Sequence, residues 1–133
     1  MDLTNINLST WSGNPSTFYS TNLGNFKAIN NFISNWNNAS STNDYLTPIT
    51  IELDTTDYTN TNRNAYNQFL ENTKKINSFL GSYIDMYRLT DFDYIYTDVS
   101  IPKNTEFNRV AINEYWTSLN NHLNFLINQV KAF

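Results

Sequence analysis

The fold is decided by residues 66–87, which read YNQFLENTKKINSFLGSYIDMY. Positions that step by three and four residues carry the larger side chains, broken only by a threonine: Tyr66, Phe69, Thr73, Ile76, Leu80, Tyr83 and Tyr87. Side chains at this spacing lie on one face of an α-helix, and a seven-residue repeat is typical of helices that pack along a seam. The pattern therefore predicts a long helix with one continuous apolar edge.

The same spacing returns at the end of the chain and, more briefly, before residue 40. The C-terminal positions are Ile112, Trp116, Leu119, Leu123, Leu126, Val130 and Phe133. Each of these two helices is expected to have roughly 26 residues and a length of about 40 Å. A shorter helix is expected over about 22–38, with apolar positions at Leu23, Phe26, Ile29, Ile33 and Trp36.

Two short segments alternate between larger and smaller or polar side chains, as half-buried strands do. The first is 48–53, with Ile49, Ile51 and Leu53, and the second is 92–99, with Tyr94 and Tyr96. We expect the two segments to pair as a small β-ribbon. A lone two-stranded ribbon is marginally stable, so it should pack on a helix or be completed by another chain.

Residues 1–20 are polar and contain the turn signal Gly13-Asn14-Pro15, so we expect an N-terminal arm. Three aromatic residues of this segment, Trp11, Phe18 and Tyr19, either pack back onto the helices or dock onto a neighbouring subunit. Residues 21–133 are then the helical domain. The expected fold class is mainly α: two long heptad-patterned helices, a shorter helix, a small β-ribbon and an arm.

Sliding the chain by 46 positions places Thr59-x-x-Asn62-Arg63-x-Ala65 on Thr105-x-x-Asn108-Arg109-x-Ala111. This match indicates a duplicated unit at 54–87 and 100–133, although an Asn-rich chain also produces chance matches. Thr59 and Thr105 can cap the following helices. Arg63 and Arg109 then fall in the first turn, where the helix dipole disfavours a cation, so we expect a carboxylate or a carbonyl of an adjacent subunit to hold them.

Composition excludes several partners. The net charge is −4 with eight Lys and Arg, which leaves no basic stripe for nucleic acid or an anionic membrane. There is no Cys and no apolar run near the ~20 residues that span a bilayer. The N-terminus lacks a basic leader and an apolar stretch, so we expect a soluble protein made in the cytoplasm. The frequent Asn is interpreted as the codon bias of an AT-rich genome.

No motif predicts catalysis, a metal or a cofactor. His122 is the one histidine, and without cysteine or a second histidine it is expected to be an ordinary helical residue. Asp91, Asp93 and Asp98 lack the glycine and distal glutamate of a calcium loop. Asp54 and Asp57 could serve a hydrolase only if a cleft shifted their pKa values. We therefore expect a protein that is not an enzyme.

Aromatic residues away from the two seams favour protein interfaces, where one edge of the ring is dry and the polar end is paired. We expect the two long seams to suit a homo-oligomer. The interface candidates, with the arm aromatics and the two arginines, are Trp11, Phe18, Tyr19, Tyr58, Arg63, Tyr94, Tyr96, Arg109 and Tyr115.

Residues 54–126 resemble a module of virion proteins from tailed bacteriophages infecting Firmicutes. The resemblance rests on Asp57-Tyr58-Thr59 to Asn62-Arg63 before a long helix, and on Asp91-Phe92-Asp93-Tyr94, Ile101-Pro102 and Thr105 to Arg109 before a second. The chain departs from the module by having Phe92 or Tyr94 where a Trp is expected, and Lys103-Asn104-Thr105 where Pro-Thr is expected.

The resemblance implies a structural role in the virion, in a tail, a baseplate or an adaptor that carries fibres. The implied partners are other virion structural proteins, without cofactor, nucleic acid or membrane. A head, neck or capsid accessory protein and a carbohydrate-binding module at the tail tip are the alternatives.

Overall fold

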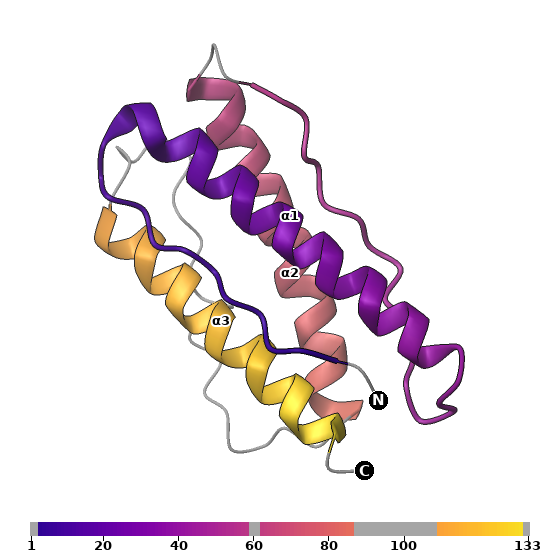
Figure 1. Ribbon diagram of the computed structural model, residues 1–133. Coiled ribbons are helices and arrows are strands. Elements are labelled where there is room, and N and C mark those ends of the chain that lie inside the picture. Colours follow the sequence, from indigo (N-terminus) through magenta and orange to yellow (C-terminus); the bar gives the residue numbers. More distant parts are fainter. Residues whose placement is uncertain (1–2, 59–61, 87–108, 132–133) are drawn as a thin grey trace.

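The computed structural model describes residues 3–58, 62–86 and 109–131 and is mainly helical, which confirms the expected class. Its helices are α1 (Pro15–Ser40), α2 (Asn62–Met86) and α3 (Arg109–Lys131), shown in Figure 1. The two other described stretches, 3–14 and 41–58, contain no helix or strand.

Helix α1 begins at Pro15, seven residues before the expected Asn22, because the signal read as a loop turn is a helix cap. Asn14 has an extended backbone (φ −76°, ψ 121°), and its side-chain Oδ1 accepts a hydrogen bond from the Ser16 N–H at 3.1 Å. Proline at the first helical position loses no hydrogen bond. Gly13, with φ +92°, turns the chain from the arm into the helix. The arm is therefore 3–14, and residues 15–20 are helical.

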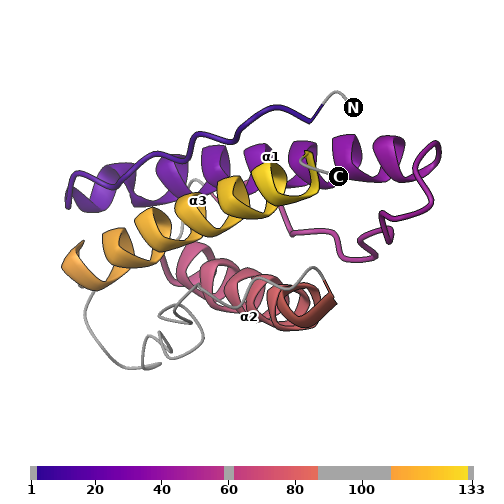
Figure 2. The ribbon, with the colours of Figure 1, turned by 90° about the horizontal axis from the view of Figure 1, so that it is seen from below.

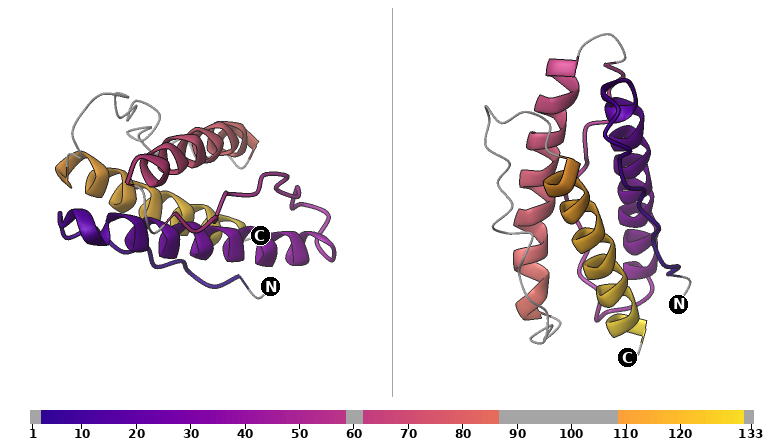
Figure 3. Two further views of the ribbon diagram at one scale, coloured as in Figure 1. Left: turned by 90° about the horizontal axis from the view of Figure 1, so that it is seen from above. Right: turned by 90° about the vertical axis from the view of Figure 1, so that its left-hand side faces the viewer.

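All three helices run in the same direction along the molecule (Figures 1 and 3). Parallel neighbours need long return connections, unlike the short loops that join antiparallel helices. The stretch 43–58 is such a return, since it runs back beside α1 before α2 begins (Figure 1). The arm likewise runs against the direction of α1, along the side of the molecule where α1 and α3 lie together (Figure 2).

One apolar core joins the helices and both extended segments. Aromatic rings meet edge to face at its centre: Trp116 lies 5.5 Å from Phe26 and 5.6 Å from Phe69 between ring centroids. Such ring pairs add stability beyond the area they bury. The expected apolar positions of α2 and α3 are buried wherever their side chains are described: Tyr66, Phe69, Thr73, Ile76, Leu80, Ile112, Trp116, Leu119, Leu123, Leu126 and Val130.

The expected β-ribbon is not formed by the part of it that is described. Residues 48–53 are extended, with Ile49 and Leu53 buried, but no strand is assigned in 3–58, 62–86 or 109–131. Alternation predicts an extended chain with one buried face, but it does not specify what receives the main-chain hydrogen bonds. In this protein helix side chains receive them. The other half of the expected ribbon, 92–99, lies outside the described residues.

Candidate functional site

Asparagine side chains on the helices bind the main chain of the extended segments. On α1, Asn30 Oδ1 accepts from the Leu53 N–H at 2.9 Å and its Nδ2 donates to the Leu53 carbonyl at 3.0 Å. Asn37 does the same to Ile49, at 2.7 and 2.9 Å. A carboxamide carries one acceptor and a donor group in the arrangement of a peptide group. Each asparagine therefore acts as a one-residue substitute for a neighbouring strand, and we call this pairing a main-chain clamp.

The opposite edge of the same segment is held by α2. Asn72 accepts from the Asp54 N–H at 2.9 Å and donates to the Asp54 carbonyl at 2.8 Å. Gln68 donates to the Thr56 carbonyl at 2.9 Å. Consecutive residues of an extended chain present their main-chain groups to opposite sides. Both edges of the segment are thus occupied, so it behaves as a central strand between two helices.

The arm is bound in the same way between α3 and α1. Asn124 clamps Ile6 at 2.8 and 2.9 Å, and Asn113 clamps Trp11 at 2.6 and 2.7 Å. Between them, a third asparagine of α3, at position 120, accepts from the Leu8 N–H at 2.9 Å. From α1, Asn25 clamps Ser9 with both distances at 2.8 Å.

The spacing of the clamps follows from helix and strand geometry. Ile6 and Leu8 are two residues apart in the arm, and their partners Asn124 and Asn120 are four apart in α3. Two extended residues cover about 6.6 Å, and four helical residues cover about 6 Å. The two lengths nearly match. Asparagines at intervals of four and seven along a helix can therefore stay in register with the residues of an extended chain that runs antiparallel to it.

Buried apolar side chains anchor each segment between its clamps. Leu3, Ile6 and Trp11 of the arm are at most 8 % exposed. In the second segment the buried residues are Leu46, Ile49 and Leu53. The indole N–H of Trp11 donates to the Asn14 carbonyl at 2.9 Å, so burial leaves no polar atom of that ring unpaired. The hydrophobic contacts supply binding energy, while the clamps satisfy the main chain and fix the register.

Two titratable groups of the second segment and its surroundings are perturbed. Hydrogen bonds from the Thr56 side chain and main chain hold the pKa of Asp54 below 3.8, its ordinary value, with Gln68 and Lys75 adding smaller effects in the same direction. The Tyr19 pKa is raised above 10.0, first by burial and then by a hydrogen bond with Asp57. The Asp54 carboxylate is therefore favoured by its hydrogen bonds with Thr56, and the Tyr19 hydroxyl stays neutral where the segment passes between α1 and α2.

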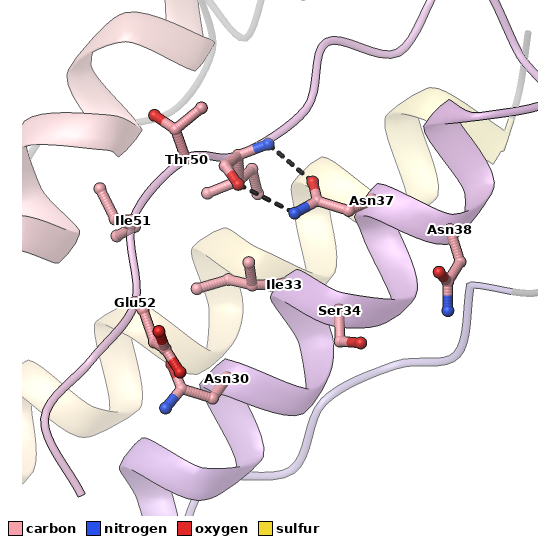
Figure 4. Close-up of a pocket in the computed structure, with 9 residues that line it drawn as sticks. Asn30, Ile33, Ser34, Asn37, Asn38, Thr50, Ile51 and Glu52 are labelled. Carbon is pink, nitrogen blue, oxygen red and sulfur yellow. Dashed lines mark hydrogen bonds between the residues drawn. The ribbon is translucent and has the colours of Figure 1, made fainter.

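The outer face of α1 carries asparagines whose side chains have no hydrogen-bond partner among the described residues. Asn31, Asn35 and Asn38 lie on this face, with Asn31 and Asn38 exposed and Asn35 half-buried. A groove of about 390 Å³ on one side is lined by Ser34, Asn38 and residues 49–52, and Figure 4 shows the two α1 side chains pointing away from that segment. A smaller groove of about 170 Å³, on the arm side, is lined by Asn31 and Asn35.

The expected interface residues fall into three groups. Trp11, Phe18, Tyr19 and Tyr115 are buried in the chain's own core, and Tyr58 is half-buried against it. For the arm aromatics this is the first of the two expected arrangements, packing back onto the helices.

The two arginines are exposed, and Tyr94 and Tyr96 lie outside the described residues. Arg109 donates to the Ser12 carbonyl at 3.4 Å, a partner in the chain's own arm. Its side chain also passes close to Gly13, where an added Cβ would lie 2.7 Å from the arginine Cδ. The arginine therefore holds the turn between the arm and α1.

His122 is buried, and its Nδ1 lies 2.7 Å from the Ser118 carbonyl one turn earlier. In the part of the chain that the structure describes, no three His, Asp or Glu side chains are grouped to hold a metal ion. Asp91, Asp93 and Asp98 are outside that part. The described helices include none that is both long and apolar enough to cross a membrane.

The clamping asparagines were missed because the sequence analysis interpreted asparagine as genomic bias. A signal was present in their spacing. Asn113, Asn120 and Asn124 of α3 are separated by seven and four positions, as are the residues of an apolar seam. They lie beside that seam, so a polar stripe bordering an apolar one marks where an extended chain is bound.

No family model, curated protein or solved structure matches this chain.

Proposed function

We propose that the chain is a non-enzymatic structural protein of a tailed bacteriophage that joins neighbouring components of the tail or baseplate. The resemblance over 54–126 supports the virion setting, and the main-chain clamps support the joining role. We further propose that it acts as a homo-oligomer bound to other virion structural proteins. Extended arms laid across neighbours are a direct way to join subunits, since main-chain pairing gives affinity without demanding a particular sequence.

The observation that carries this proposal is the row of unpaired carboxamides on α1. Asn31, Asn35 and Asn38 are spaced by four and three positions, and α3 places its clamps at intervals of seven and four. The chain therefore already uses this residue type, at helical-face spacing, to bind extended polypeptide. The two grooves on either side give room for alternating side chains of such a segment.

The occupant that fits this face is an extended segment from a neighbouring virion protein. Glu52 is the one charged residue among those lining the two grooves, so the surface selects by main-chain hydrogen bonds and shape more than by charge. Recognition of this kind tolerates variation in the partner's side chains. A sugar platform is less well supported, because Tyr45 is the one aromatic residue of the described part that is largely exposed.

The test combines location in the particle with substitution of the α1 face. Labelled electron microscopy of purified particles is expected to place the protein in the tail or baseplate. Replacing Asn31, Asn35 and Asn38 together with alanine should leave the helical circular dichroism spectrum unchanged and abolish incorporation. A matched triple alanine variant at exposed asparagines of α2 and α3 (Asn67, Asn121 and Asn128) should be incorporated normally.

Three results would overturn the proposal at different levels. Absence of the protein from purified particles would remove the virion role altogether. Label on the head or neck would favour the accessory role there. Normal incorporation of the α1 variant would leave a virion protein that joins its neighbours through another surface.

A further inference from the structure

The two extended segments contain the same six-residue sequence motif. Residues 3–8 read LTNINL and residues 46–51 read LTPITI, so Leu, Thr and Ile recur at the first, second and fourth positions, and the sixth is Leu or Ile. The same spacing, with Phe and Tyr at the fourth and sixth positions, stands a third time in the sequence at 89–94 (LTDFDY), which lies outside the described residues. The two described occurrences can be compared position by position.

The side chains of the two occurrences are buried in the same order. In both, the first and fourth side chains are buried, the sixth is half-buried and the other three are exposed. Leu3 and Leu46 are 2 % and 4 % exposed, and Ile6 and Ile49 are 8 % and 3 % exposed. A regular strand buries every second residue. The shared interval of three between the buried positions is therefore a specific feature of these segments and does not follow from an extended chain alone.

The main chain is bound at the same position of the motif. The fourth residue is clamped through both its N–H and its carbonyl, Ile6 by Asn124 of α3 and Ile49 by Asn37 of α1. In both segments, later residues meet earlier residues of the clamping helix. The third residue is asparagine in the arm and Pro48 in the other segment, so binding does not require an N–H at that position.

We propose that the surfaces that hold 3–8 and 46–51 are two examples of one sequence-selective peptide-binding site. Its ligand is an extended segment with Leu at the first position, Ile at the fourth and Leu or Ile at the sixth. The two buried side chains select the sequence, and the helix asparagine binds the main chain of the fourth residue. The two segments of the chain are interchangeable ligands of these sites. This assignment goes beyond the proposed function and does not depend on it.

Transfer of the motif within the full chain tests the assignment. Asn5→Pro, Asn7→Thr and Leu8→Ile together give the arm the sequence of 46–51. We expect this transfer variant to keep the Tm within about 2 °C of the unmodified chain, because each position keeps the kind of side chain that the site receives.

The matched control keeps the composition of the arm and changes only its order. Ile6→Asn combined with Asn7→Ile moves the aliphatic side chain to an exposed position and places a carboxamide in the core. The Tm of this order variant should fall by about 8 °C or more. An order variant with an unchanged Tm would show that the site does not select for sequence.

Main-chain hydrogen exchange shows whether the clamp follows the motif. The N–H groups of Ile6 and Ile49 should exchange slowly in the unmodified chain, and that of Ile6 should stay as slow in the transfer variant. The reverse transfer, Pro48→Asn with Thr50→Asn and Ile51→Leu, should likewise leave the Ile49 N–H slow. This variant is judged by exchange and not by Tm, because loss of a proline lowers stability through the unfolded chain.

Two results would overturn the interchange of the segments. One is a transfer variant whose Tm falls as far as that of the order variant. The other is fast exchange at position 6 or 49 after the motif has been transferred. Either result would show that each surface accepts only the sequence that it already holds.

Discussion

Asn30 and Leu53 form two hydrogen bonds with each other, at 2.9 and 3.0 Å, through a side chain on one partner and the main chain on the other. Replacing Asn30 with alanine removes both and leaves a partly buried N–H and carbonyl unpaired. We expect the free energy of unfolding to fall by about 2 kcal/mol, measured by chemical denaturation. Asn31→Ala, at the exposed neighbouring position, should change it by less than about 0.5 kcal/mol. Equal effects of the two variants would contradict the clamp.

Alanine substitutions at two buried asparagines of α1 should change the free energy of unfolding in opposite directions. Asn25 clamps Ser9, whereas both polar atoms of the Asn22 side chain are buried without a partner. Asn25→Ala should lower the free energy of unfolding by about 2 kcal/mol, since it leaves the Ser9 main chain unpaired. Asn22→Ala should raise it by about 1 kcal/mol, because it removes an unpaired polar group from the core. Destabilisation by Asn22→Ala would show that its carboxamide is paired.

The arm depends on Trp11, which is 3 % exposed and packs edge to face on Phe18 with ring centroids 5.2 Å apart. Trp11→Ala should cost about 3–5 kcal/mol of stability and make the arm susceptible to limited proteolysis. Val110→Ala, at a residue 63 % exposed on α3, provides the control for apolar truncation. An arm that resists the protease in Trp11→Ala would mean that the clamps hold it without this anchor.

The lowered pKa of Asp54 predicts a dependence of stability on pH. Hydrogen bonds from Thr56 favour the ionised form of the Asp54 carboxyl in the folded chain. They therefore stabilise the folded state at any pH at which this carboxyl is also ionised in the unfolded chain, where its pKa is near 3.8. That contribution is present above pH 3.8 and is lost as the pH falls through the lower pKa of the folded state. Chemical denaturation at pH 6 and at pH 3 measures how far the free energy of unfolding falls between the two pH values. This fall should be smaller in Asp54→Asn than in the unmodified chain. Equal losses would assign the acid sensitivity to other carboxyls.

The helices could be predicted from sequence because their apolar spacing is dictated by the helix itself. The start of α1 could not, because Asn14 and Pro15 are equally suited to a loop turn and to a helix cap, and only the following contacts decide between them. The alternation in 48–53 correctly indicated an extended chain with one buried face. It did not reveal the partner, since Asn30 and Asn37 look the same in sequence whether they face solvent or a peptide group.

The distance along the chain between the arm and its partners on α3 sets the order of assembly. Ile6 and Asn124 are 118 positions apart, so the arm cannot bind this part of α3 until residue 124 has left the ribosome. Until then Trp11 and Ile6 remain uncovered while the rest of the protein is made. Contacts between such distant residues slow folding. Closure of the arm onto α3 should accordingly be a late step of folding, after α1 has bound the segment that follows it.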